Sequence, residues 1–185
     1  MRSVLWKLKV FFRNRKSLKK YYSYISHLKK KIFSYIDSYR FEKYINVYKD
    51  QKLIFKIIDM GEISRWRADL FDTKEPETLE WIDGFSKHDN FLDIGANIGV
   101  YSIYAALRNL QVIAIEPDSL NYALLNLNIR KNNLNNLILP YSIALNDIEK
   151  FSIFNISSLE WGGALNSFGN QLDYKGNTFN PVHKQ

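Results

Sequence analysis

Apolar residues after position 90 alternate between short runs and helically spaced stripes. Runs at residues 91–94, 112–115 and 137–145 have the length and composition of strands. The stripes between them have the i, i+3, i+4 spacing of a helix face, at Val100, Ile103, Tyr104 and Leu107 and then at Leu120, Leu124 and Leu127. The order strand, helix, strand, helix, strand predicts an α/β protein with a parallel sheet and right-handed crossovers.

Pro140 lies inside the third predicted strand, where proline cannot donate a ladder hydrogen bond. We therefore expect this strand at a sheet edge, as in the order 3-2-1 that opens a doubly wound, Rossmann-like sheet. Only the N-terminal half of such a sheet is predicted, because residues 151–156 suit one more short strand and residues 161–185 have a Gly- and Asn-rich loop composition. The first strand would keep an open edge, which soluble proteins normally cover. We expect a fragment, or a complementary chain that completes the sheet.

Two further zones precede this segment. β-Rich runs at residues 44–48 and 53–58, joined by four polar residues, predict a hairpin. A short helix is expected after Glu75, where Pro76 and acidic residues mark a helix start. The expected organisation is a basic helical arm at residues 1–38, a hairpin with its lead-in at 39–74, an incomplete Rossmann-like domain at 75–160 and a loop-rich tail at 161–185.

Positive charge is concentrated in the arm. The formal net charge is +7, but residues 1–31 hold eleven Lys or Arg and no acid, so the rest sums to −4, the difference between +7 and +11. The arm suits contact with an anionic membrane surface or nucleic acid, although a solvated helix is the commoner outcome for charge runs. Lys residues interrupt its apolar positions, so we expect no membrane span or secretory signal and a cytoplasmic protein. With no Cys and three widely spaced His, no metal site is expected.

The first predicted strand ends in the glycine-bent turn D-I-G-A-N-I-G, residues 93–99. Gly95 and Gly99 permit backbone angles that other residues avoid, and Asn97 also tolerates left-handed geometry. The spacing G-x-x-x-G departs from the G-x-G-x-x-G of dinucleotide sites. A carboxylate at Asp93 would repel a pyrophosphate but attract the ammonium and sulfonium of S-adenosylmethionine (SAM). The sign of the charge favours SAM.

Glu116 follows the second predicted strand, 21 residues beyond Gly95. An acid at this place can accept hydrogen bonds from two ribose hydroxyls, in SAM as well as in NAD. Simpler interpretations are an exposed acid at the strand end for Glu116 and a loop-capping carboxylate for Asp93. The glycines alone are weak evidence for a cofactor site. The combination of strand, Asp93 loop, helix, second strand and Glu116 is more specific evidence for one.

The sequence D-I-G-A-N-I-G-V-Y-S at residues 93–102, followed by I-E-P at 115–117, resembles the FkbM family of class I methyltransferases. E-P-E-T-L-E-W-I-D at residues 75–83 and A-L-N-D at 144–147 fit the same pattern. The resemblance spans roughly residues 65–169. It implies a class I methyltransferase fold with SAM as cofactor. The cofactor-binding positions that it implies are Asp93, Gly95, Ala96, Asn97 and Gly99 around the methionine part, Glu116 at the ribose, and Ile143 and Ala144 beside the adenine.

The resemblance implies O-methylation of a hydroxyl on a sugar or secondary metabolite, with the acceptor-binding half missing. No residue is assigned as the catalytic base. Two alternatives stay open on the sequence. One is a Rossmann domain that binds NAD or a nucleotide sugar, and the other is a non-catalytic protein that acts on membranes or nucleic acids through its basic arm.

Overall fold

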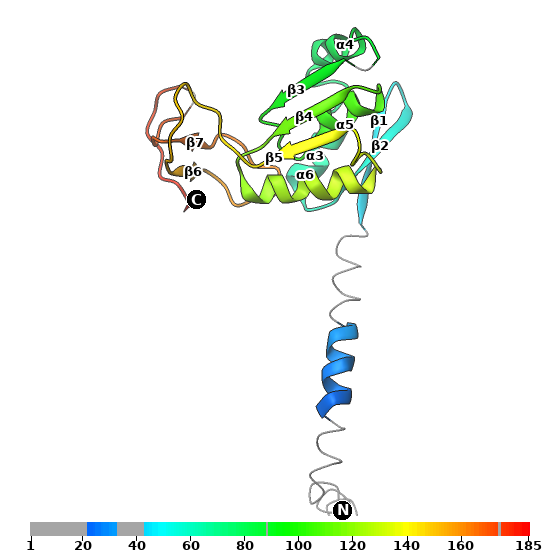
Figure 1. Cartoon of the computed structure of the whole chain (residues 1–185), viewed down its shortest axis with the longest axis vertical. Coiled ribbons are helices and arrows are strands. Elements are labelled where there is room, and N and C mark those ends of the chain that lie inside the picture. The colour runs from blue at the N-terminus through cyan, green and yellow to red at the C-terminus, as the bar shows by residue number, and fades with distance from the viewer. Residues whose placement is uncertain (1–21, 33–42, 88, 174) are drawn as a thin grey trace, which may run out of the picture. The chain divides into compact units, whose positions relative to one another are not determined.

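The computed structural model describes residues 22–32, 43–87, 89–173 and 175–185, and element labels follow Figure 1. The chain divides into two compact units, Met1–Lys43 and Tyr44–Gln185. In the first unit, residues 22–32 form a largely exposed α-helix, while residues 1–21 and 33–38 of the predicted basic arm lie outside the described residues. Within the described ranges, no helix combines the length and apolar content needed to cross a membrane.

The second unit begins with the predicted hairpin. Strands β1 (Tyr44–Lys49) and β2 (Lys52–Ile58) pair antiparallel, with a register shift between Val47 and Tyr48. Asp50 and Gln51 make the turn with φ of 50° and 62°, the left-handed values of a tight hairpin turn. The inward side chains of both strands enter the hydrophobic core. The hairpin prediction is confirmed.

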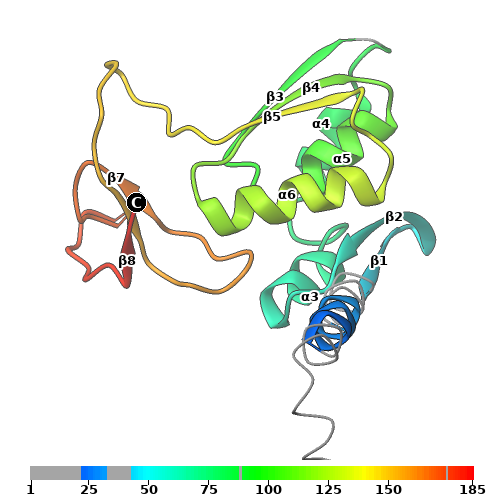
Figure 2. The same ribbon diagram turned by 60° about the horizontal axis from the view of Figure 1, so that its bottom comes forward.

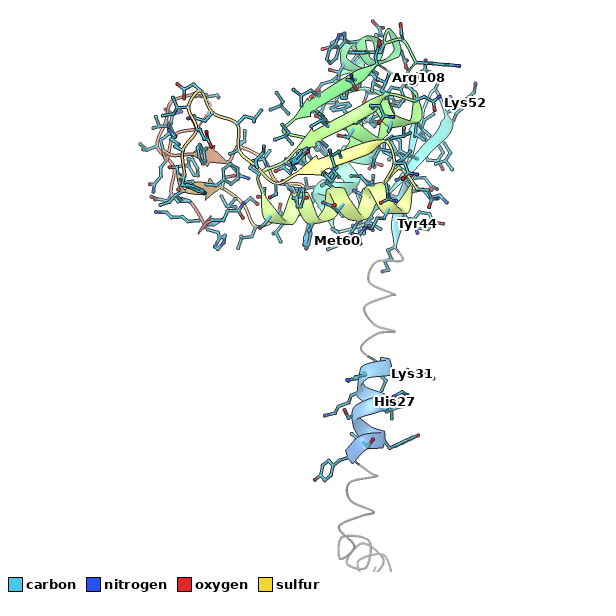
Figure 3. All side chains as sticks on the ribbon, viewed as in Figure 1. His27, Lys31, Tyr44, Lys52, Met60 and Arg108 are labelled. Atoms are coloured by element: carbon cyan, nitrogen blue, oxygen red, sulfur yellow. The ribbon has the colours of Figure 1, made fainter. Side chains whose placement is uncertain are left out.

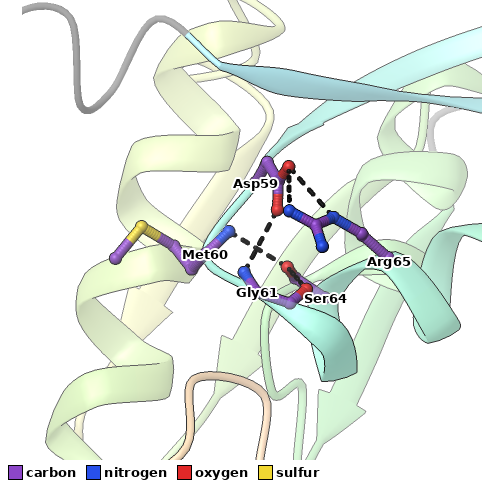
Figure 4. A network of polar contacts seen from close by, with 5 residues as sticks. All are labelled: Asp59, Met60, Gly61, Ser64 and Arg65. Atoms are coloured by element: carbon purple, nitrogen blue, oxygen red, sulfur yellow. Dashed lines mark hydrogen bonds and ion pairs between the residues drawn. The ribbon is translucent and has the colours of Figure 1, made fainter.

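Helix α3 (Glu62–Asp69) follows the hairpin and is not predicted by the sequence pattern. Its start is fixed by polar contacts, which Figure 4 shows: the Ser64 hydroxyl accepts from the Met60 amide at 3.0 Å and donates to the Gly61 carbonyl at 2.8 Å. Asp59 accepts from the Gly61 amide at 3.1 Å and from both Nε and Nη2 of Arg65. Only Ser64 and a single alanine of α3 are buried, so the helix carries almost no apolar stripe.

Helix α4 (Pro76–Asp83) begins at proline, as predicted, and buries Leu79 and Ile82. Its last residue, Asp83, accepts hydrogen bonds from Lys49 at 2.6 Å and from Tyr104 at 2.7 Å, and it pairs with Arg108 at 3.1 Å. Burial would raise the pKa of Asp83, but these donors outweigh it and hold the pKa below its ordinary value. The cluster joins the hairpin to α4 and to α5 (Val100–Leu107).

The same cluster borders an open cavity of about 360 Å³ at the hairpin turn. Lys52 at the start of β2 and Arg108 after α5 both line it, and Figure 3 labels these two residues at this end of the unit. The charge of Asp83 is compensated by its ion pairs with Lys49 and Arg108. These residues of the cavity wall therefore already have a structural role.

The parallel sheet is made of β3 (Asn90–Ile94), β4 (Gln111–Ile115) and β5 (Ile138–Tyr141), in the order β3-β4-β5. Helices α5 and α6 (Ser119–Lys131) connect the strands, and Figure 2 shows both on the same side of the sheet. The βαβαβ prediction and the edge position of Pro140 are confirmed. The third strand is shorter than predicted, since it ends at Tyr141.

One face of this sheet packs on the helices and the other remains open. Residues on the helix side, such as Phe91, Val112 and Ile138, are buried. On the opposite side, Leu92, Ile113 and Leu139 form one cross-strand row and are 51%, 42% and 53% exposed. Within the described residues β3 has no partner on its far edge, as expected for the first half of a doubly wound sheet.

The C-terminal part differs from the prediction. The further strand is present as β6 (Phe154–Ile156), but it pairs antiparallel with β7 (Ser167–Phe168) and β8 (His183–Lys184) in a separate small sheet. Residues 161–185 are therefore not only a loop. Buried Asn155 fixes this sheet by donating its side-chain amide to the Asn170 carbonyl at 2.5 Å. Two-residue strands have no periodicity that a sequence pattern could reveal.

Candidate cofactor-binding site

The glycine turn at the end of β3 has the strained geometry that its sequence predicts. Gly95, Asn97 and Gly99 have φ of 80°, 53° and 89°, all in the left-handed region. The amides of Gly95 and Ala96 both donate to the Ile115 carbonyl, at 2.8 and 2.9 Å. A Cβ on Gly99 would overlap the Leu125 side chain of α6, so glycine is needed for helix packing as well as for the turn. The turn thereby directs the start of α5 toward the end of β4.

Glu116 is buried at the end of β4, with 5% of its surface exposed, so it is not an exposed strand-end acid. One carboxylate oxygen accepts from the Asn97 amide at 2.7 Å, and the other accepts from the Asp118 amide at 2.9 Å. Burial raises the pKa of Glu116, and these amide hydrogen bonds only partly oppose the rise. The Asn121 side chain also interacts with the carboxylate and opposes the rise in pKa. A carboxylate has about four lone-pair sites, so Glu116 has acceptor capacity left for a ligand hydroxyl. Glu116 thus holds the glycine turn and remains suited to a sugar.

Asp93 lies at the carboxyl end of β3 and contacts α5. Its Oδ2 accepts from the buried Ser102 hydroxyl at 2.5 Å. Burial raises the pKa of Asp93 above its ordinary value, against the opposing hydrogen bond from Ser102. The Asp93 carboxylate therefore has a local structural partner, as expected if it only caps the loop. It also lies beside the glycine turn, where a cofactor would bind.

Residues 161–164, here called the glycine strap, lie against the site although the sequence predicts an ordinary loop. The Gly163 carbonyl accepts from the side-chain amides of Asn97 at 2.7 Å and Asn121 at 2.9 Å. The Gly162 amide donates to Asn121 Oδ1 at 2.7 Å, and the Gly162 carbonyl accepts from Arg67. The strap therefore joins the glycine turn, α6 and α3. The sequence signal for it is the glycine pair within an Asn-rich segment.

Three ionisable residues that the sequence interpretation does not assign to the site also interact with it through their charges. Arg67 on α3 is mostly buried, and burial lowers its pKa, while the charges of Glu116, Tyr101 and Glu75 oppose that change. Burial and the neighbouring Glu75 raise the pKa of Tyr101, in the first turn of α5. The site thus holds the acids Asp93 and Glu116 beside Arg67, while the charge of Glu75 is compensated by Lys74 at 2.9 Å.

Ile143 and Ala144 lie in the irregular segment after β5. The Ile143 side chain is 48% exposed, and Ala144 is half-buried. Among the described contacts, none joins either residue to the glycine turn. Their assignment to an adenine therefore stays a prediction.

The parallel order β3-β4-β5, with a glycine turn after the first strand and an acid after the second, defines a Rossmann-like α/β unit. The candidate site lies where this fold places its ligands, outside the carboxyl ends of the strands. Figure 1 shows the strands ending on the side from which the chain continues toward β6 and β7.

A scan against protein-family models finds no match, and a search of curated proteins finds none. Among solved structures, the chain is similar to the tRNA m1G37 methyltransferase of M. jannaschii, at 20% identity and a TM-score of 0.39, over 53% of this chain and 29% of that one. It is also similar to the METTL16 methyltransferase domain, at 16% identity and a TM-score of 0.38, over 63% of this chain and 57% of that one. The chain thus spans less than a third of the first protein and just over half of the second.

Proposed function

We propose that this chain binds SAM at the carboxyl ends of β3 and β4 and serves a SAM-dependent methyltransferase. The observation that carries this proposal is the left-handed glycine turn held between two carboxylates, Asp93 and Glu116. Parallel strands place such groups at one sheet edge, within reach of a single nucleotide-type ligand.

The charge of the site fits SAM better than a dinucleotide. Asp93 and Glu116 contact the glycine turn and the first turn of α5, where a dinucleotide would place its pyrophosphate, whereas Glu75 nearby is compensated by Lys74. Negative side chains repel phosphate oxygens, whereas SAM brings an ammonium and a sulfonium to the same place. The raised pKa values of Asp93 and Glu116 are caused by burial, so a cationic ligand would favour their charged forms.

When bound, SAM supplies a methyl group on a sulfonium, which is already an activated leaving group. The residues of this chain then have to bind and orient, with Glu116 accepting from the ribose and the glycine turn fixing the approach of the backbone. From the FkbM resemblance, the finer proposal is transfer to a hydroxyl oxygen of a sugar or secondary metabolite. No described residue is assigned as the acceptor site or as the catalytic base.

Calorimetric titration of the full chain with S-adenosylhomocysteine tests the proposal. We expect binding that is weakened by Asp93→Asn and by Glu116→Gln, each roughly tenfold or more, which is the usual effect of a charged hydrogen bond. Glu149→Gln is the matched control, because Glu149 is exposed on the irregular segment after β5. NAD binding without S-adenosylhomocysteine binding would select the dinucleotide alternative instead.

We also propose that a complementary polypeptide covers the open face and edge of the sheet. The exposed row of Leu92, Ile113 and Leu139, next to the unpaired edge of β3, supports this proposal. If the isolated chain is a monodisperse monomer that melts cooperatively, the proposal is wrong. Contact of residues 1–31 with an anionic membrane surface and a cytoplasmic location stay predictions, and liposome co-sedimentation before and after deletion of those residues tests the first.

A further inference from the structure

Arg67 differs from the other arginine on the same helix. Arg65 is exposed and donates through Nε and Nη2 to the carboxylate of Asp59, with the shorter contact at 2.9 Å. Arg67 donates through Nε at 3.0 Å and Nη2 at 2.7 Å to a neutral acceptor, the Gly162 carbonyl. Among the described residues, no carboxylate lies within ion-pair distance of Arg67. Arg67 is therefore a mostly buried cation whose guanidinium lies 5.9 Å from the centroid of the Trp66 ring and has no contacting anion.

Such an arrangement is costly for a protein that uses it only for structure. Buried charges are normally paired, because an ion removed from water loses its hydration without compensation. A contacting anion would remove the cost, and the described part of the chain does not supply one.

The geometry of the guanidinium specifies the kind of anion. The Gly162 carbonyl uses the edge made of Nε and one hydrogen of Nη2. The other edge, made of Nη1 and the second hydrogen of Nη2, can form two parallel hydrogen bonds, which match the two oxygens of a carboxylate. The Gly162 contact fixes the plane of the group, and among the described residues no hydrogen bond is made by Nη1 on this edge.

The groups around Arg67 indicate that the ligand also carries a positive charge. Glu116 and Glu75 act on Arg67 through their charges without touching it, and Glu75 is already paired with Lys74 at 2.9 Å. Glu116, which has no ion pair among the described residues, would attract a cation located a short distance from the bound carboxylate. An α-amino acid has this combination, with an ammonium and a carboxylate on one carbon. The methionine end of SAM is an α-amino acid.

We propose that Arg67 binds the carboxylate of the methionine end of SAM, with the glycine strap orienting the guanidinium. This inference rests on the function proposed above. Gly162 suits the role because its φ is 89°, and a Cβ there would lie 3.0 Å from Ile63 Cγ2 and 3.4 Å from Arg67 Nε. A side chain at this position would push the strap away from the arginine.

The test is calorimetry on the full chain with two ligands that differ only in the carboxylate. One is S-adenosylhomocysteine, and the other is S-adenosyl-3-thiopropylamine, the amine that lacks the carboxylate. The unmodified chain is expected to prefer S-adenosylhomocysteine by roughly 10- to 100-fold, the usual effect of hydrogen bonds to a charged group. Arg67→Met is expected to remove that preference and to leave the affinity for the amine unchanged.

Arg65→Met is the matched control and should keep the full preference. If circular dichroism shows that Arg67→Met does not fold, Arg67→Lys carries the test, and it should lose most of the preference because a lysine has no planar fork. Equal affinity for both ligands in the unmodified chain, or a preference that survives at Arg67→Met, would overturn the role of Arg67 while SAM binding stands. If S-adenosylhomocysteine does not bind the unmodified chain, the proposed function fails, and the inference fails with it.

Discussion

Asn121 is the side chain on which the position of the glycine strap depends most. It is 2% exposed, and its amide donates to the Gly163 carbonyl at 2.9 Å while its Oδ1 accepts from the Gly162 amide at 2.7 Å. In Asn121→Ala, the Gly162 amide loses its partner among the described residues, whereas the Gly163 carbonyl keeps Asn97. The substitution therefore leaves one buried donor unsatisfied and one acceptor half-satisfied.

The expected loss follows from these two bonds. An orphaned buried donor costs about 1–3 kcal/mol, and loss of a bond from an acceptor that keeps another partner costs about 1 kcal/mol. Asn121→Ala should therefore lower the free energy of unfolding by about 2–4 kcal/mol. Urea denaturation followed by far-UV circular dichroism and by tryptophan fluorescence measures this change and tests whether the two probes coincide.

Asn126→Ala is the matched control on the same helix. Asn126 donates only to the Tyr122 carbonyl one turn earlier, at 2.8 Å, and its side chain is half-buried. Its replacement should change stability by no more than about 0.5 kcal/mol, since alanine favours the helix. Equal effects of the two substitutions would refute the role given to Asn121 and the strap.

Three further predictions concern the turn, the hairpin cluster and pH. Gly99→Ala should lower the free energy of unfolding in urea by about 2–5 kcal/mol, because left-handed strain of about 1–2 kcal/mol adds to an overlap with α6 of about 1–3 kcal/mol. Gly95→Ala has the same backbone strain but open space around the new Cβ, so it should cost about 1–2 kcal/mol. A larger loss for Gly95→Ala than for Gly99→Ala would contradict the packing of Gly99 against α6. The pKa of Asp83 is lower in the folded protein than its ordinary value of 3.8. Asp83 therefore stabilises the fold above pH 3.8, and this contribution is lost as the pH falls through the pKa of the folded state. Asp83→Asn should flatten the pH dependence of the urea midpoint in that acid range, and an unchanged slope would be evidence against the cluster. Because the pKa values of Asp93 and Glu116 are raised, these carboxylates are protonated at a higher pH than ordinary ones. Calorimetry should therefore show S-adenosylhomocysteine affinity falling as the pH is lowered, and an affinity that stays constant through the acid range in which carboxylates titrate would disagree.

The central part of the fold is predictable from sequence because its strands and helices bury regular stripes. Val100, Ile103 and Tyr104 of α5 all enter the core, as their spacing indicates. Helix α3 is not predictable in this way, since its buried residues are Ser64 and Ala68. Polar contacts, rather than an apolar face, fix its first turn.

The candidate site is only partly predictable for a similar reason. Glycine spacing and a strand-end acid are local features, and both Gly99 and Glu116 lie where they are expected. The strap depends on side-chain amides that meet backbone carbonyls more than forty residues away, as in the contact between Asn121 and Gly163. Arg67 reaches Gly162 across a still longer separation. No periodicity connects such pairs, so the sequence pattern does not reveal them.

The structure of the full chain bound to S-adenosylhomocysteine is the most direct measurement of the proposed function. We expect the ribose hydroxyls within hydrogen-bond distance of the Glu116 carboxylate and the amino-acid end beside Asp93. The proposed function is contradicted if the ligand binds away from the glycine turn, or if NAD binds there with phosphate oxygens against Asp93.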